Sequence, residues 1–262
     1  LYCMNHTFKT RIPDNAKLMQ VRFIPKGNYY VMEVCYQVEV PDCFEESNRI
    51  ASIDLGVENF ITMTNNIGEE PIVIKGGVIK SINQYYNKKK SKLQSELKKC
   101  NGKDWSRALE KLTNKRYEMI KYQMHCISKY VVDYCVLHSI DTLVVGHNKD
   151  WKQENTGKQN FTYIPYELFM NMLKYQCENN GIKFIEVVEN YTSGTSFLDN
   201  EEPCKKNYNK QRRIYRGLFV SNDGVKINAD VNGSYQIMRK VFPNVFDNGI
   251  DGVHLHPVIV NL

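Results

Sequence analysis

Apolar and polar residues alternate with a period of two in the first part of the chain. The segment VRFIP (21–25) is followed by the turn KGN and then by YYVMEVCYQVEV (29–40), in which every second residue from Tyr30 to Val38 is large and apolar. A period of two is typical of strands, and the turn between the segments is short, so the pattern predicts a β hairpin. The turn-forming segment PDCFEESN (41–48) then predicts a linker.

A second unit begins at Arg49 with three short apolar segments, RIASIDLG (49–56), ENFITMTN (58–65) and EPIVIKG (70–76). Each has the length of a strand, and the first two follow one another so closely that antiparallel pairing is expected. Two further segments lie later in the chain: DTLVVG (141–146) predicts a buried strand, and IKFIEVVE (182–189) predicts another strand.

Segments with a helical period separate these strands. Helices are predicted over Ile79–Cys100, Lys103–Ser139 and Pro165–Asn180, and a last helix is predicted in NADVNGSYQIMRKVF (228–242). Gly181 follows the third helix, as expected for a helix end. Apolar residues three or four positions apart form a stripe along the second helix, which indicates core packing. These residues are Ile120, Met124, Ile127, Val131 and Cys135.

The order of elements defines the expected fold class. Three antiparallel strands followed by β-α-β crossovers predict an α/β protein with an RNase H-like (RuvC-like) mixed sheet flanked by helices. Actin-like ATPases share this layout. We therefore expect residues 49–262 to form this domain and residues 1–48 to be the C-terminal part of a β-rich domain. Because the chain begins at Leu1, we also expect a longer protein to have lost its N-terminus.

Charge is distributed unevenly along the chain. The net charge of +6 is modest, but Lys75 to Lys129 holds fifteen basic and four acidic residues, and a second basic run from Lys205 to Arg216 contains no acid. Clustered positive charge favours phosphate backbones as partners, although solvated helix faces would look the same. We see no signal peptide and no apolar run that could cross a membrane, so we expect no membrane partner and a cytoplasmic location.

The eight cysteines are scattered and form no CxxC pair. In a chain of this size without a secretion signal, they are expected to be reduced thiols, mostly in the core.

Two aspartates stand where metal-dependent phosphodiester chemistry would need them. Such chemistry uses carboxylates that converge on two metal ions about 4 Å apart, and Mg²⁺ prefers oxygen ligands. Asp54 ends an apolar strand before Gly56, and Asp230 begins the last helix. Each has an ordinary alternative, because Asp54 could bind its own turn and Asp230 could cap the helix. Asn232 and Gly233 are unusual inside a helix and favour a constrained site.

Read together, the segments DLGV (54–57), LVVGHNKDWKQE (143–154), YTSGTSFLD (191–199) and NADVNGSYQIMRK (228–240) resemble the successive motifs of the TnpB/OrfB family of bacterial insertion sequences. That family is related to small type V CRISPR effectors. The resemblance implies an RNA-guided DNA endonuclease that uses a guide RNA and two Mg²⁺ ions, acting on DNA in the bacterial nucleoid. It also implies that residues 1–48 are the end of a wedge domain.

The sequence departs from the family pattern at two places. Many members carry a catalytic glutamate at the end of the fourth strand, where this chain has Gly146. A subgroup with glycine there carries a glutamate on the next strand, which implies that Glu189 is the third metal-binding residue beside Asp54 and Asp230. Other carboxylates near this position are Asp150, Glu154 and Glu186.

The second departure is at the zinc ribbon. Ser196 and Asp199 stand where its first cysteines would be, so we expect no zinc and a basic insertion at about 190–227 in its place. Interleaved cations and aromatic rings suit single-stranded nucleic acid, and a plain loop is the alternative. The expected nucleic-acid contacts, taken from this insertion and from two earlier basic segments, are Lys88, Lys89, Lys90, Lys149, Trp151, Lys152, Lys205, Lys206, Lys210, Arg212, Arg213 and Arg216.

Two hypotheses about function remain. The first is an active RNA-guided DNA endonuclease in which Asp54, Glu189 and Asp230 bind Mg²⁺. The second is a nuclease-dead, RNA-guided DNA-binding protein that lost catalysis with the fourth-strand glutamate. Retention of both aspartates favours the first. An actin-like ATPase is a third option, but no Gly-Gly phosphate loop follows the first strand. The sequence sets no oligomeric state.

Overall fold

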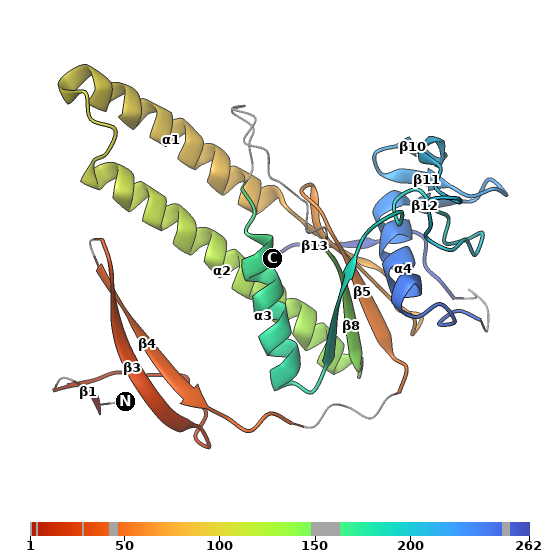
Figure 1. The fold of residues 1–262 in the computed structure, drawn as a ribbon, viewed down its shortest axis with the longest axis horizontal. Helices are drawn as coiled ribbons and strands as arrows, with labels where there is room; N and C mark the ends of the chain where they lie inside the picture. Colours follow the sequence, from red (N-terminus) through yellow and green to blue (C-terminus); the bar gives the residue numbers. More distant parts are fainter. Residues whose placement is uncertain (1, 4, 28, 42–46, 148–162, 248–251) are drawn as a thin grey trace.

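A six-stranded mixed sheet lies at the centre of the protein (Figure 1). The computed structural model describes residues 2–3, 5–27, 29–41, 47–147, 163–247 and 252–262. The order across the sheet is β13-β7-β6-β5-β8-β9. The strands in this order are Val258–Val260, Ile72–Lys75, Asn59–Asn65, Ile50–Leu55, Thr142–His147 and Lys183–Val188.

The direction of each strand agrees with the sequence prediction. Strands β5, β6 and β7 pair antiparallel, whereas β8 and β9 run parallel to β5. The predicted α/β class, a mixed sheet flanked by helices, is therefore confirmed. Because β5, β8 and β9 are parallel, their C-terminal ends meet at one edge of the sheet, where their polar side chains can converge.

Helices cover both faces of the sheet (Figure 1). Helices α2 (Arg107–Leu137) and α3 (Tyr166–Asn179) pack on one face, and α4 (Ala229–Val241) packs on the other. The alternation along β5 decides which residues face which layer. Ala51, Ile53 and Leu55 belong to the core with α2 and α3, while Ile50 packs with Ile237 of α4.

The predicted helices lie within a few residues of their expected bounds. Helix α1 (Gly77–Asn101) ends at Gly102, whose φ of 66° is the left-handed conformation that favours glycine at a helix end. Helix α2 begins after Ser106, whose hydroxyl oxygen accepts a hydrogen bond from the Leu109 amide. The five stripe residues of α2 are all buried, which confirms that the stripe is core.

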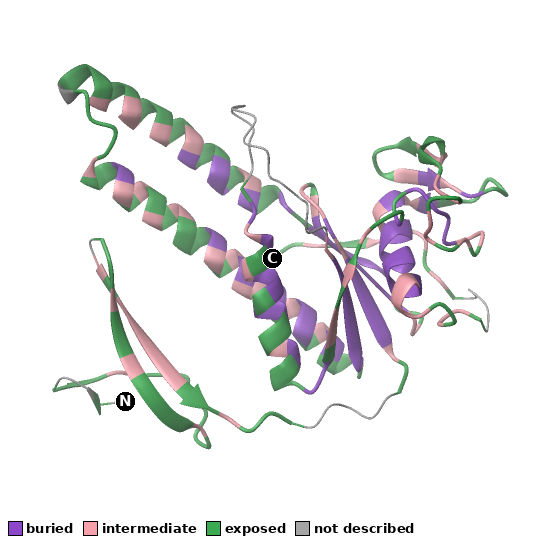
Figure 2. Ribbon diagram, viewed as in Figure 1, coloured by how far each residue is buried: buried purple, intermediate pink, exposed green. Residues whose placement is uncertain are grey.

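A hairpin of β3 (Lys17–Lys26) and β4 (Tyr29–Gln37) precedes the sheet, as predicted. Its residues are exposed or half-buried, in contrast to the mostly buried strands β5, β6, β7 and β8 of the central sheet (Figure 2). Two short strands, β1 (Tyr2–Cys3) and β2 (His6–Thr7), pair before it. The assignment of this region to a wedge domain stays a prediction.

Residues 190–227 are more structured than a plain loop. Within them lie a 3₁₀ turn, η1 (Lys210–Arg212), and two strands, β10 (Arg213–Tyr215) and β11 (Leu218–Val220); β12 (Lys226–Asn228) completes a small antiparallel sheet. Phe219 and Ile227 are fully buried in a cluster with Phe197 and Tyr235. Strands of three residues are too short to show a period, which is why the sequence did not predict them.

Two other expectations can be compared with the structure. Six cysteines are described as free thiols, but only Cys135 and Cys177 are buried, so the expectation that most lie in the core was wrong. Among the described residues, no helix combines the length and the apolar character needed to cross a membrane.

Candidate metal centre and nucleic-acid interface

Asp54 lies near the end of β5 on the face that α4 covers. Its neighbour Ile53 pairs in register with Val145 of β8, which places Asp54 beside Gly146. On the other side, Asp54 pairs with Thr62 of β6. Paired residues in adjacent strands point to the same face of the sheet. Asp54 therefore has a residue without a side chain on one side and a buried hydroxyl on the other.

Asp230 lies in the first turn of α4, but it does not cap this helix. The cap is Asn228, whose side-chain oxygen accepts hydrogen bonds from the Asp230 and Val231 amides. The Asp230 carboxylate accepts instead from Asn59 Nδ2 at 2.6 Å and from Arg213 Nη2 at 2.9 Å. The capping alternative left open by the sequence is thus wrong, and the carboxylate is turned toward the sheet and the insertion.

Gly233 lets α4 approach the sheet closely. A Cβ atom at this position would lie 2.9 Å from Asp54 Oδ2, which is too near for an ordinary contact. One residue further, the Ser234 hydroxyl donates to the Ser52 carbonyl at 2.9 Å. The helix is therefore attached to β5 one turn from Asp230, which brings the two aspartates of helix and strand together.

Asn232 is fully buried and joins α4 to the insertion. Its Oδ1 accepts from the Phe197 amide at 2.9 Å, and its Nδ2 donates to the Thr195 carbonyl at 2.8 Å. Asn232 and Gly233, the two unusual helix residues noted in the sequence, thus have separate structural roles. Gly233 provides space for Asp54, and Asn232 ties the segment 195–197 to the helix.

Glu189 follows β9 directly, and its side chain lies over Gly146. A Cβ atom at Gly146 would lie 2.8 Å from Glu189 Cγ and 3.1 Å from Glu189 Oε1. The glycine and the glutamate are therefore sterically complementary. Glu189 Oε1 is buried and, among the residues that the structure describes, has no hydrogen-bond partner. An unpartnered buried carboxylate oxygen is costly and calls for an explanation by function.

The three carboxylates influence one another electrostatically. Loss of hydration, followed by the negative charges of Glu189 and Asp230, raises the pKa of Asp54 well above its usual value, while the positive charge of Arg213 acts in the opposite direction. Loss of hydration also raises the pKa of Glu189 to about 7. Such a cluster disfavours the fully charged state and would be relieved by a bound cation.

The other carboxylates considered for the third position do not join this cluster as far as the structure describes them. Glu186 is exposed on β9, three residues before Glu189, so the strand's alternation directs it to the opposite face. Asp150 and Glu154 lie outside the described residues.

Two residues at the site were not identified as such from the sequence. The Tyr166 hydroxyl donates to the Gly56 carbonyl at 3.0 Å, and the charges of Glu189 and Asp54, after burial, raise the tyrosine's pKa. In the sequence, Tyr166 is an aromatic residue at the start of an amphipathic helix, a pattern that indicates only core packing. The other residue is Arg213, which the sequence placed among phosphate contacts.

The donor chemistry of the site fits a hard divalent cation. Carboxylate oxygens from Asp54, Glu189 and Asp230 gather at one edge of the sheet, and one of them is buried without a partner. In the parts of the chain that the structure describes, no three His, Cys, Asp or Glu side chains already surround one ion position. A physical reason is visible at Asp230, whose two oxygens already accept from Asn59 and Arg213.

The basic insertion is only partly available for nucleic acid. Lys205, Lys206, Lys210 and Arg216 are exposed. Arg212 instead pairs with Glu201 at 2.7 Å, and its guanidinium lies 3.7 Å from Asp199. Both Arg212 and Arg213 are thus paired with acidic side chains within the chain, and their contact with nucleic acid stays a prediction. Lys149, Trp151 and Lys152 lie outside the described residues.

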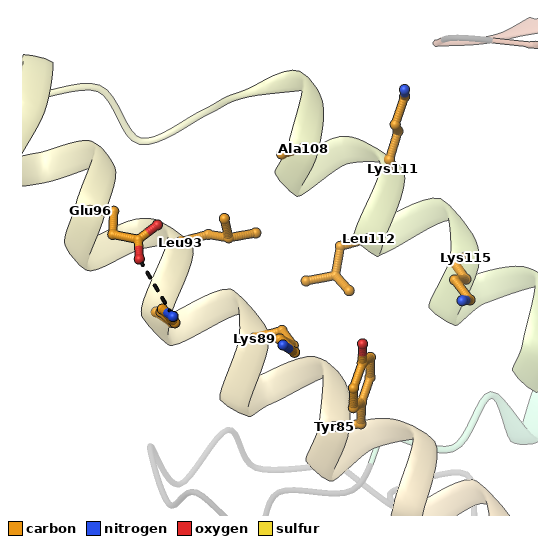
Figure 3. A pocket seen from close by; sticks show the side chains of 9 residues that line it. Tyr85, Lys89, Leu93, Glu96, Ala108, Lys111, Leu112 and Lys115 are labelled. Carbon is orange, nitrogen blue, oxygen red and sulfur yellow. Dashed lines mark ion pairs between the residues drawn. The ribbon is translucent and has the colours of Figure 1, made fainter.

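A second basic surface lies between α1 and α2 (Figure 3). The helices enclose a groove of about 430 Å³, lined by four lysines, an exposed tyrosine ring and an apolar floor. We call this surface the lysine groove; it comprises Tyr85, Lys89, Lys92, Leu93, Glu96, Ala108, Lys111, Leu112 and Lys115. Glu96 is its one acidic residue. Of the predicted contacts, Lys89 lines the groove, Lys88 is exposed nearby, and Lys90 lies over the Tyr86 ring.

Comparison with known families connects these observations. Residues 33–152 match the OrfB_IS605 family, described as a probable transposase, and residues 166–237 match the Cas12f1-like TNB domain. The second match spans α3, β9, Glu189, the whole basic insertion and most of α4.

Similar proteins point the same way. The TnpB-like protein ORF457 of Acidianus two-tailed virus is 24% identical over 202 residues, which is 74% of this chain and 42% of that protein. The CRISPR-associated endodeoxyribonuclease Cas12f1 of Sulfoacidibacillus thermotolerans is 23% identical over 231 residues, covering 84% of this chain and 51% of that protein. The chain thus spans about half or less of these relatives.

Solved structures share the fold. A Cas12f1–sgRNA–target DNA complex matches with a TM-score of 0.54 and 19% identity, covering 83% of this chain and 54% of that one. A CRISPR-Cas12f ternary complex matches with a TM-score of 0.57 and 17% identity, covering 83% of this chain and 44% of that one. The fold is the RuvC-like one expected from the sequence, shared with the Cas12f1 structures. The matches to OrfB_IS605, to the Cas12f1-like TNB domain and to the two relatives confirm the resemblance to the TnpB/OrfB family that the motifs show.

Proposed function

We propose that this chain carries the nuclease centre of an RNA-guided DNA endonuclease, with Asp54, Glu189 and Asp230 as its metal-binding residues. The observation that carries this proposal is the position of Glu189. Its carboxylate lies over Gly146, beside Asp54, and one of its oxygens is buried without a partner. A protein without catalysis would have no need of three mutually repelling carboxylates in one partly buried place.

The residues of the site would hold the metal ions and orient the carboxylates that bind them. The carboxylates would hold two Mg²⁺ ions, which when bound stabilise the attacking and leaving oxygens of a phosphodiester. Asn59 fixes the orientation of Asp230, and Lys75 Nζ in turn donates to Asn59 Oδ1 at 2.7 Å. Ser234 and Gly233 hold α4 against β5, so the aspartates of helix and strand stay in register. The absence of zinc remains a prediction.

We propose nucleic acids as partners because of the charge and shape of two surfaces. The lysine groove combines four cations with one exposed aromatic ring, and the insertion adds four exposed cations. Such surfaces suit phosphate contacts and base stacking. One of the similar structures is a complex of Cas12f1 with sgRNA and target DNA, which supports RNA and DNA as the two partners here. The wedge assignment of residues 1–48 belongs to the same proposal.

The test is metal-dependent cleavage by the full-length protein with its guide RNA. Asp54→Asn and Asp230→Asn should each lower Mg²⁺-dependent cleavage by about a thousandfold or more, while guided binding to the target DNA persists. Glu186→Gln is the matched control, since this carboxylate is exposed on β9 outside the cluster, and it should cut at the parent rate.

The alternative function gives a different result in the same experiment. A nuclease-dead RNA-guided DNA-binding protein would bind the target without cutting it in the parent as well as in both variants. If either variant cuts at the parent rate, the assignment of the metal-binding residues is wrong.

A further inference from the structure

We infer that Arg213 competes with the divalent cation for Asp230, so that the basic insertion sets the metal affinity of the site. This inference rests on the proposed function, because it assumes that Asp230 is a metal ligand. It concerns an interaction that the sequence had assigned to nucleic-acid binding, and it uses a residue from outside the central sheet.

The contact between the two residues is direct. Arg213 Nη2 lies 2.9 Å from Asp230 Oδ1, and both side chains are partly shielded, with exposed fractions of 33% and 24%. The remaining oxygen, Oδ2, accepts from Asn59 at 2.6 Å. Both carboxylate oxygens therefore already have a donor. A cation bound at Oδ1 would face the guanidinium at close range, and two positive charges at one oxygen repel each other.

The guanidinium is held in this position by its own segment. Arg213 Nε and Nη2 also donate to the Arg216 carbonyl, at 3.2 Å and 2.8 Å, across the turn between β10 and β11. The arginine is thus fixed before it meets Asp230 and loses little conformational freedom there. The effect of its charge reaches further, since Arg213 also lowers the pKa of Asp54.

The turn that carries Arg213 has a second attachment to α4. The Ala229 amide donates to the Gly217 carbonyl at 3.1 Å, and the small sheet buries Phe219 and Ile227 in its own cluster. Loss of the Arg213 side chain should therefore leave the insertion docked. This separation makes it possible to remove the competing charge without removing the segment that carries it.

The experiment measures binding of Mn²⁺ alone, by electron paramagnetic resonance titration of the full chain without nucleic acid. Arg213→Gln should bind Mn²⁺ about three- to tenfold more tightly than the parent, as expected when a partly exposed ion pair no longer has to be broken. Its melting temperature in EDTA should fall, and Mn²⁺ should raise that temperature by more than in the parent. A merely structural arginine would lower the melting temperature without tightening Mn²⁺ binding.

Two controls separate the possible outcomes. Arg216→Gln removes an equal charge three residues away, from a side chain that is 77% exposed, and should leave Mn²⁺ binding within about twofold of the parent. Asp54→Asn should weaken Mn²⁺ binding strongly. If Asp54→Asn has no effect, the metal centre itself is wrong and the proposed function fails with it.

The inference is overturned if Mn²⁺ binding depends on Asp54 but Arg213→Gln leaves the affinity unchanged or weaker. It is also overturned if Arg216→Gln tightens binding equally, because the effect would then be one of general charge. Should Arg213→Gln not fold, Arg213→Met removes the same charge and keeps an unbranched side chain. It should bind Mn²⁺ more tightly than the parent, and an affinity at or below that of the parent would contradict competition.

Discussion

Neutralising Glu189 should change how the stability of the protein depends on pH. Loss of hydration raises the pKa of this carboxylate from 4.5 to about 7. An acid with a raised pKa in the folded state contributes stability that is fully present below the unfolded value, near 4.5, and is lost as the pH rises through 7. The parent protein should therefore lose stability between pH 5 and pH 8, and Glu189→Gln should lack this part of the loss.

The size of the effect follows from the shift. A pKa difference of about 2.5, at about 1.4 kcal/mol for each pH unit, sets an upper value of roughly 3.5 kcal/mol. Because Glu189 keeps some contact with solvent, we expect about 2 kcal/mol after screening. In a chain of this length, that corresponds to a change of roughly 4 to 8 °C in melting temperature.

The assay is thermal unfolding of the parent and of Glu189→Gln at pH 5 and pH 8, with EDTA present throughout. The melting temperature of the variant relative to that of the parent should rise by several degrees between the two pH values. The unsatisfied amide of the new glutamine lowers the stability of the variant at both pH values. The quantity to measure is therefore the difference in melting temperature between variant and parent, and how this difference changes from pH 5 to pH 8.

Glu186→Gln is the control, because it removes an exposed carboxylate from the same strand and should show the same difference at pH 5 and pH 8. The melting-temperature difference between Glu189→Gln and the parent could also be the same at both pH values, or the control could show an equal change. In either case, the glutamate does not lie in the partly buried cluster that the structure describes. The assignment of Glu189 as the third carboxylate would then lose its main support.

Three further predictions concern the geometry of the site and of the lysine groove. Gly146→Ala should lower stability by about 1 to 2 kcal/mol, because its Cβ atom would lie 2.4 Å from Ile237 Cδ1 as well as close to Glu189; chemical denaturation measures this, and an unchanged midpoint would contradict the close packing. Gly233→Ala should weaken Mn²⁺ binding, since the methyl group would press on Asp54, and an unaltered affinity would show that α4 can move away freely. Replacing the four groove lysines by glutamine should reduce the log–log salt slope of nucleic-acid binding by about 0.7 to 0.9 for each phosphate that the groove no longer neutralises. The control replaces four exposed lysines elsewhere, namely Lys17, Lys26, Lys174 and Lys226. An equal reduction of the salt slope in this control would mean that the groove has no special role in binding.

The sequence by itself determined five strands of the central sheet and the principal helices. Strands β5 to β9 were predicted because each is a short apolar segment, and helices α1 to α4 because each is long enough to show a helical pattern. The sequence also predicted a site at Asp54 and Asp230, because both occupy defined places in motifs whose order resembles that of the family; that both bind metal stays a prediction. Parallel β8 and β9 follow from helical crossovers, which join parallel strands.

The small elements of the fold were decided by tertiary structure. Strand β13 pairs with β7, which lies far away in the chain, and the strands β10 to β12 have three residues each. Such short segments gain their conformation from long-range pairing and from buried contacts with Phe197 and Tyr235, neither of which leaves a local pattern.

The roles of individual side chains were likewise decided in three dimensions. Arg213 and Lys210 belong to one basic run, yet the first pairs with Asp230 and the second is exposed. Glu189 and Glu186 belong to one strand segment, yet only the first has its side chain over Gly146. Residue type and spacing state which charges are present, whereas register and the docking of α4 decide which of them meet. An electrostatic interaction depends on the distance between the two charged groups and on the water between them. The amino-acid sequence specifies neither of these directly.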